Sequence, residues 1–248
     1  MKKLNTEDAM KVEFGILRPF GPRVGKVQCP PSVVELMLEI TDSIVADDNH
    51  ESSGKNLVGQ IVSEPHISRE ILLETGAFKF FNGMLYHYLY NVLNELKGYF
   101  VHQANKLEDE FLLETNVKDM WSVHMKPGGE YNPLHFHTFC HVSSVMYLKI
   151  PEYQKRGVAH KAETDGNIEL VNHASGPESL DNGTMSISPK VGEMFMWPSN
   201  LLHTVYPFLG DEERRSVAWN GTYKLTNKEN GHVIMGDRTI EVPVIPGM

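Results

Sequence analysis

The feature that most constrains the fold is a change of hydrophobic pattern near residue 117. From there on, short apolar or alternating runs are separated by Gly, Pro, Asn and Asp. Many short strands with frequent turn signals are typical of a β-sandwich or barrel, and jelly rolls of the cupin type fit this description. Composition alone leaves the type of sandwich open. The predicted strands are 119–126, 142–150, 166–172, 184–188, 193–197, 202–208, 215–224 and 233–244.

The first part of the chain has helical patterns instead. Apolar residues recur at helical spacing over 33–44, directly after a Pro-Ser pair at 31–32 that suits a helix start. A longer helical region covers about 68–97, with Gly76 and Gly83 as candidate breaks. These segments predict a helical layer laid against a sheet.

Two further N-terminal segments complete the predicted organisation. Residues 11–20 predict a strand, and the polar, turn-rich residues 46–56 predict a surface loop. We expect a single domain over 1–248, of the mostly β class with flanking helices (α+β). Within it, 1–115 would form an N-terminal strand and helical layer that supports a jelly-roll catalytic core at 116–248.

Charge and cysteine content argue against several function classes. Lys plus Arg is 23 and Asp plus Glu is 32, which gives a net charge of 23 − 32 = −9. This surplus disfavours generic nucleic-acid binding and docking on anionic membranes. Two cysteines far apart in the chain, Cys29 and Cys140, predict a reducing compartment rather than a disulfide framework. No signal peptide or membrane span is evident, so we expect a cytoplasmic protein.

The stretch PLHFHTFCHVSS stands out among the 12 histidines of the chain. His135 and His137 are two residues apart, so on a strand they would point to the same face, about 7 Å apart, and could converge on one metal ion. His141 lies four residues further on and is a possible substitute ligand. A single HxH pattern is a weak signal, because such pairs also occur by chance in a His-rich chain.

A second segment, GEMFMWPSNLLHTVYPFLGDEERRSVAWNGTY, strengthens the case. His203 and Arg214 are eleven residues apart, which would suit a hairpin of two short strands that brings Arg214 back beside His203. The planar fork of Arg binds a carboxylate through two hydrogen bonds. In isolation, the acidic and basic run 211–215 favours a solvated salt-bridge loop, but its spacing from His203 favours a site for a small dicarboxylate chelated to a metal.

These segments, in this order, resemble a known family. The HxH pair is followed by SSVMYLKIP, GNIEL, VGEMFMWPSNLLHTVYPF and RRSVAWN, which together resemble the phage and bacterial branch of the 2-oxoglutarate/Fe(II) oxygenases related to prolyl hydroxylases. The resemblance covers about residues 117–224. It implies a double-stranded β-helix core, Fe(II) and 2-oxoglutarate as cofactors, and O₂ as co-substrate. The implied reaction is hydroxylation of an unidentified small-molecule or peptidyl substrate, with release of succinate and CO₂.

The resemblance also implies a role for each matching position. The implied iron ligands are His135, His137 and His203. The implied contacts to the far carboxylate of 2-oxoglutarate are Arg214, Ser216 and Tyr147. One departure from the family pattern is that His137 stands where most members have a carboxylate. A third neutral ligand adds one unit of positive charge to the site, and the sequence leaves open whether His137, Glu130 or a water completes it.

Two alternatives remain open at this stage. A cupin-type three-His metalloenzyme would bind metal through the same histidines without using 2-oxoglutarate, and the RxS segment argues against it. A non-catalytic jelly-roll module is the other, since a fold can persist after its chemistry is lost. The loops 151–165 and 173–183 are predicted to flank the barrel mouth as lid and specificity loops. The sequence does not name the substrate or the oligomeric state, for which a homodimer is our working hypothesis.

Overall fold

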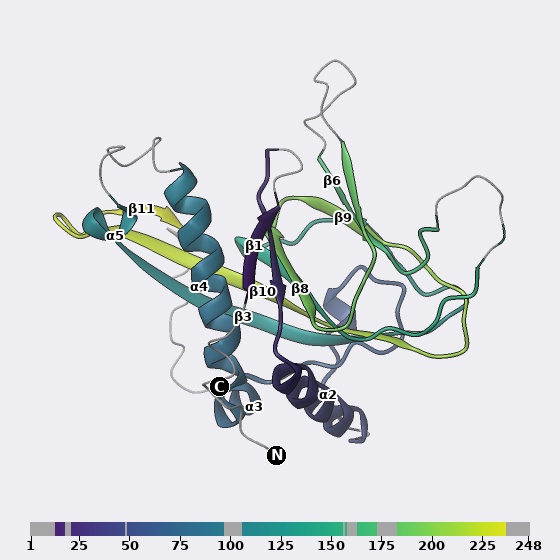
Figure 1. Ribbon diagram of the computed structural model, residues 1–248. Coiled ribbons are helices and arrows are strands. Elements are labelled where there is room, and N and C mark those ends of the chain that lie inside the picture. Colours follow the sequence, from purple (N-terminus) through teal and green to yellow (C-terminus); the bar gives the residue numbers. More distant parts are fainter. Residues whose placement is uncertain are drawn as a thin grey trace.

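The computed structural model contains two antiparallel β-sheets and a layer of helices (Figure 1). The larger sheet has the order β1-β2-β8-β5-β10-β11, with β3 also paired to β10, and the smaller sheet has the order β4-β9-β6-β7. This is the predicted class, mostly β with flanking helices around a jelly-roll core. The residues that the structure describes are 13–17, 21–47, 49–96, 106–155, 157, 163–172 and 183–236.

The strands agree with most of the predicted ranges. Strands β2 and β4 and the first half of β3 were not predicted, because their sequences lack a clear alternation. The predicted strand 233–244 begins as β11, and its remainder lies outside the described residues. The strands are β1 Glu13–Leu17, β2 Val24–Gln28, β3 Phe111–Met125, β4 Asn132–His135, β5 Val142–Lys149, β6 Ile168–Val171, β7 Thr184–Ile187, β8 Glu193–Pro198, β9 Leu202–Val205, β10 Arg214–Asn227 and β11 Val233–Gly236.

The helices follow the predicted patterns closely. The longer helical region divides at Gly76, whose φ of 79° is the left-handed conformation that ends a helix and that glycine adopts at low cost. Gly83 lies inside α4 and does not break it. The helices are α2 Pro31–Val45, α3 Arg69–Thr75, α4 Ala77–Leu96 and α5 Leu107–Glu110, with a 3₁₀ turn η1 at Gly54–Asn56.

The large sheet separates two hydrophobic cores. Because side chains alternate along a strand, Val217 and Trp219 of β10 face the helices. The alternate residues Ser216, Ala218 and Asn220 line the space toward the smaller sheet. Gly221 allows α4 to lie close, since a Cβ there would come within 2.7 Å of the Leu85 side chain. The same alternation in β5 and β8 places Met146 on the helix side and Tyr147 between the sheets.

A segment between α2 and α3 lies across the outside of the inter-sheet space. Isolated β-bridges join Ser63 to His124 and His66 to Trp121, both on β3, and Gln60 to Tyr131. The N-terminal part of the chain therefore contributes to the wall of the space between the sheets as well as to the helical layer.

Candidate metal centre

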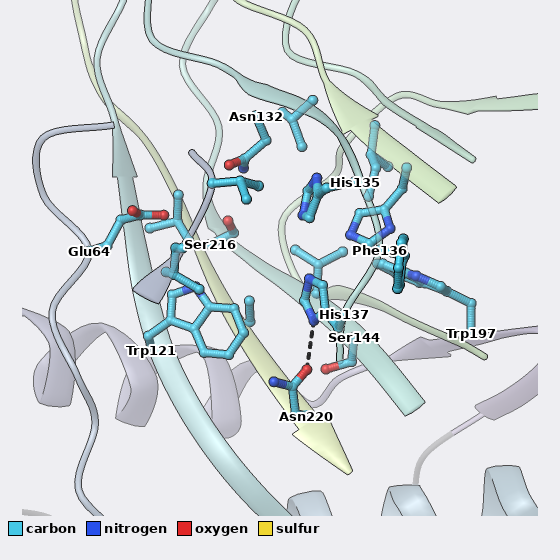
Figure 2. A pocket seen from close by; sticks show the side chains of 18 of the residues that line it. Glu64, Trp121, Asn132, His135, Phe136, His137, Ser144, Trp197, Ser216 and Asn220 are labelled. Carbon is cyan, nitrogen blue, oxygen red and sulfur yellow. Dashed lines mark hydrogen bonds between the residues drawn. The ribbon is translucent and has the colours of Figure 1, made fainter. Parts of the chain in front are cut away.

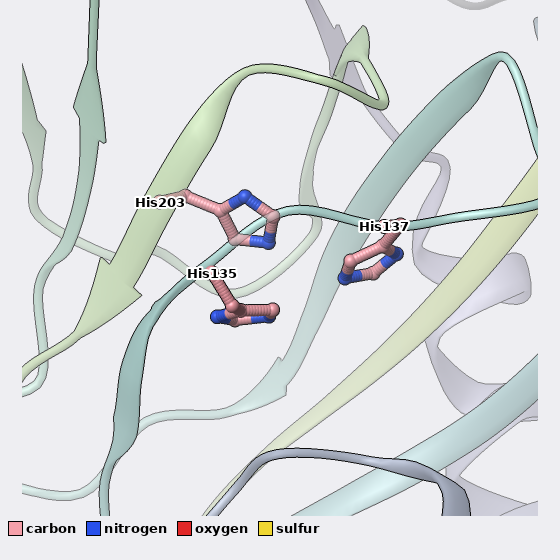
Figure 3. Close-up of side chains that lie close together, drawn as sticks. All are labelled: His135, His137 and His203. Atoms are coloured by element: carbon pink, nitrogen blue, oxygen red, sulfur yellow. The ribbon is translucent and has the colours of Figure 1, made fainter. Parts of the chain in front are cut away.

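Three histidines meet between the sheets: two lie on the neighbouring strands β4 and β9, and the third lies just after β4 (Figure 3). His135 ends β4, and its register partner on β9 is His203. His137 follows two residues later. One nitrogen of each ring lies within 4.8 Å of the others, and the ring centroids of His135 and His203 are 4.2 Å apart. This is a compact imidazole cluster of the kind that binds a transition metal.

Hydrogen bonds set the orientation of all three rings. The Nδ1 atoms of His135 and His203 lie 2.7 Å and 3.0 Å from the backbone carbonyls of Pro133 and Leu201. Because a carbonyl only accepts, Nδ1 carries the proton in both rings and Nε2 keeps its lone pair. The Nδ1 of His137 lies 2.7 Å from Oδ1 of Asn220, which fixes the same tautomer. Such partners orient metal-binding histidines and select the ligand nitrogen.

Burial keeps the cluster neutral, as metal ligation requires. Burial is the main cause that lowers the pKa of His135, that lowers the pKa of His137 to about 4, and that holds the pKa of His203 well below its ordinary value. Mutual repulsion between the rings lowers the pKa of His137 and His203 further. The donor set, its tautomers and its neutrality all fit a divalent metal ion such as Fe(II).

The local backbone differs from the predicted pair on one strand. Strand β4 ends at His135, and His137 is held instead by the bond from its N–H to the Ser199 carbonyl, at 3.0 Å. His141 does not join the cluster, because its ring packs on Tyr223 and its Nδ1 accepts the Tyr223 N–H. Glu130 accepts backbone N–H groups of Lys126 and Val62 and does not reach the cluster.

Arg214 occupies the same inter-sheet space and is 1% exposed. Its guanidinium carbon lies 5.0 Å from the centre of the Tyr147 ring. Among the described residues no carboxylate forms an ion pair with Arg214, and its Nε is buried without a hydrogen-bond partner. Burial raises the pKa of Tyr147 to about 12, so this hydroxyl keeps its proton and can donate it. Ser216 is the register partner of Tyr147 and lines the cavity.

The predicted hairpin between His203 and Arg214 is wrong. Strand β9 belongs to the small sheet and β10 to the large sheet, so the intervening residues cross from one sheet to the other. Both side chains line the cavity, but they come from strands of different sheets. The alternative of a salt-bridge loop at 211–215 holds for one of its two arginines. Arg215 forms ion pairs with Asp42 and Glu213 on the opposite face of β10, whereas Arg214 lines the cavity.

A cavity of about 320 Å³ is lined by the three histidines, Arg214 and Ser216, whereas Tyr147 is not among its lining residues (Figure 2). Sequence reasoning missed Glu64, whose side chain comes from the segment laid on β3, and it gave no role to Asn220. No sequence signal marks Glu64, because its burial depends on tertiary pairing. The lining residues besides the histidines, Arg214, Ser216, Glu64 and Asn220 are Asn56, Leu57, Val58, Trp121, Val123, Asn132, Phe136, Thr138, Ser144, Val145, Ile168, Trp197, Val205 and Ala218.

A comparison with known protein families points to the same segment of the chain. Residues 119–220 match the model of the family described as "Putative 2OG-Fe(II) oxygenase". The segment that carries the three histidines and Arg214 is therefore similar to this family. This confirms the resemblance found in the sequence.

Solved structures show similar arrangements at low identity. A prolyl-4-hydroxylase from Pseudomonas putida is 14% identical over 86% of this chain and 95% of its own, with a TM-score of 0.46. A prolyl hydroxylase from Trichoplax adhaerens is 13% identical over 84% and 82%, with a TM-score of 0.48. The chain spans 45% of an oxidoreductase of the 2OG-Fe(II) oxygenase family from Burkholderia pseudomallei, with 12% identity and a TM-score of 0.34. No curated protein sequence matches the chain. Among the described residues, no helix is long and apolar enough to span a membrane.

Proposed function

We propose that the protein is a 2-oxoglutarate/Fe(II)-dependent dioxygenase that hydroxylates its substrate with release of succinate and CO₂. The observation that carries the proposal is the buried Arg214, which lacks an acidic partner among the described residues and lines the same cavity as the three histidines. An uncompensated buried charge is costly. A carboxylate bound between Arg214 and the histidines would supply the missing counter-charge.

One group of side chains would bind the metal ion. His135, His137 and His203 would hold Fe(II) through Nε2, and Asn220 would keep the His137 ring in register. Bound Fe(II) and 2-oxoglutarate supply the oxidising chemistry.

The far carboxylate of 2-oxoglutarate would be held by a second group of side chains. Arg214, Ser216 and the Tyr147 hydroxyl would donate hydrogen bonds to it. Trp197, which is buried and also lines the cavity, would exclude water around the histidines.

The N-terminal part has a supporting role in this proposal. Strand β2 pairs with β8 of the large sheet, and α2 and α4 contribute to the core on its outer face. We infer that 1–115 and 116–248 work as one domain. The two cysteines form no disulfide, and we assign the protein to the cytoplasm on the grounds of its cysteine content.

An anaerobic titration tests the proposal directly. Apo-protein is titrated with Fe(II) and then with 2-oxoglutarate, and the visible charge-transfer band of an iron-chelated keto acid is followed. The wild type should give the band, and His203→Ala should not. Arg214→Met should still bind Fe(II) but need at least about 100-fold more 2-oxoglutarate, since a buried charge-assisted bidentate contact contributes about 3 kcal/mol.

Two outcomes would count against the assignment. If Fe(II) binds to the wild type without a band, the protein is a three-His metalloenzyme that does not use the keto acid. If Arg214→Met keeps the wild-type affinity for 2-oxoglutarate, Arg214 is not its carboxylate partner. Arg215→Met serves as the matched control, because the neighbouring side chain points to the opposite face of β10.

A further inference from the structure

Glu64 is a buried carboxyl in the cavity for which the proposed chemistry has no use. Its side chain is 2% exposed, and Oε2 has no hydrogen-bond partner. Among the described residues, no Lys, Arg or His forms an ion pair with it. Figure 2 shows the carboxyl group directed into the cavity, on the side of Trp121.

Backbone pairing holds Glu64 in this position. The neighbouring Ser63 and Pro65 carbonyls accept N–H groups of β3, from His124 at 3.0 Å and Ser122 at 2.9 Å. The Glu64 carbonyl accepts the N–H of Ser53 at 2.9 Å. The backbone is therefore held on both sides of the Glu64 Cα, which is the arrangement expected of a positioned binding group rather than of a mobile surface acid.

Ionisation of the Glu64 carboxyl is energetically unfavourable in this buried position. Burial, and secondarily the negative charge of Glu130, raise the pKa of Glu64 to about 7. Glycine backbone lies against it, since a Cβ on Gly59 would come within 3.2 Å of Oε1. Buried carboxyls are ordinarily hydrogen-bonded or paired. The Glu64 carboxyl has no such partner in the protein, and a ligand in the cavity could supply one.

The surroundings of Glu64 suit a cation on an apolar stem. The Trp121 ring, 5% exposed, lines the same cavity as Glu64, and its centroid is 5.8 Å from that of His137. Aromatic rings attract ammonium and guanidinium groups. Val58 and Phe136 line the cavity and are about half exposed, at 48% and 53%, so they offer apolar contact at the entrance.

We propose that Glu64 binds a positively charged nitrogen, an ammonium or guanidinium group, on the primary substrate, with the Trp121 ring beside the cation and the Val58–Phe136 entrance around its apolar stem. This inference rests on the proposed function for the identity of the cavity as the place of reaction. It narrows the substrate to cationic molecules or cationic side chains. The substrate cation would restore the charge balance that the fold leaves open at Glu64.

Paired probes that differ only in charge test the inference. Binding of N-acetyl-lysine methylamide and N-acetyl-norleucine methylamide to the apo-protein is measured by NMR titration at pH 8, where Glu64 is mostly ionised. The wild type should prefer the lysine probe at least tenfold, and Glu64→Gln should reduce the preference below about twofold. Glu70→Gln, which removes an exposed acid on α3, is the control and should keep the wild-type ratio.

Free pentylammonium and pentanol form a second pair that distinguishes the source of the cation. Preference for the capped lysine over pentylammonium indicates a polypeptide substrate, and equal affinity indicates a small amine. Equal binding of charged and neutral probes by the wild type overturns the proposal, even if Glu64→Gln fails to fold. Because these titrations need neither Fe(II) nor 2-oxoglutarate, a failed keto-acid titration would reject the proposed function without deciding the role of Glu64.

Discussion

Replacing Glu64 by glutamine should make the ligand-free protein more stable at neutral pH. The folded-state pKa of Glu64 is about 7, against an ordinary value of 4.5. The folded protein therefore binds this proton more tightly than the unfolded chain does. The stabilisation from protonated Glu64 is fully present below about pH 4.5 and is lost as the pH rises through about 7. Glutamine has no such titration.

The magnitude follows from the two pKa values. Between pH 5 and pH 8, linkage gives a loss of roughly 2.5 kcal/mol for a group with these pKa values. Water in the cavity screens part of the effect, so we expect about 2 kcal/mol. Because all other titrating groups are common to the two proteins, the difference in unfolding free energy between Glu64→Gln and wild type isolates this one carboxyl.

Urea unfolding of both proteins at pH 5 and pH 8 measures the effect. Glu64→Gln should gain about 2 kcal/mol relative to wild type between the two pH values. A gain smaller than about 0.5 kcal/mol would show that the carboxyl is solvated in the folded state, and it would remove the argument that Glu64 lacks a partner. Glu70→Gln, at an exposed position, should show no comparable gain.

Three further substitutions test the orientation of a metal-binding histidine and the packing of β10 against the helices. Asn220→Ala should weaken Co(II) binding about 10- to 100-fold, because His137 loses the partner that orients its ring; calorimetry that shows unchanged affinity would remove this role. Arg215→Ala should lower the unfolding free energy by about 2 kcal/mol, because the mostly buried Arg215 loses its ion pairs with Glu213 and with the exposed Asp42, and Arg215→Lys should recover only part of it. Gly221→Ala should destabilise by about 1–3 kcal/mol because its Cβ meets Leu85, with a loss below about 0.5 kcal/mol indicating that α4 simply shifts.

The sequence predicted the elements that local pattern controls. Helix α2 and the break at Gly76 follow from periodicity and glycine chemistry, and the order of short strands indicated the jelly roll. The three histidines and Arg214 were identified because their residue types and spacing carry a chemical meaning. That these residues bind Fe(II) and 2-oxoglutarate stays a prediction.

The parts that escaped prediction depend on contacts between distant segments. Strand β2 is defined by pairing with β8, and Glu64 is buried only because its segment lies on β3. The prediction of a hairpin was wrong for a related reason. The spacing in sequence allows Arg214 to return near His203, but it does not show to which sheet the strand with Arg214 belongs. Local pattern contains no information on how the chain crosses between the two sheets.

The cavity wall is assembled from two stretches of chain that are held in different ways. The histidines, Arg214 and Ser216 lie on or beside strands that also form the inner sheets, so a change there disturbs the whole sandwich. Glu64 and Val58 come instead from a connecting segment, 46–68, that is attached through isolated bridges. Such a segment can be exchanged without rebuilding the strands. Exchange of this segment could therefore alter which ligands the cavity accepts while the three histidines and Arg214 stay in place.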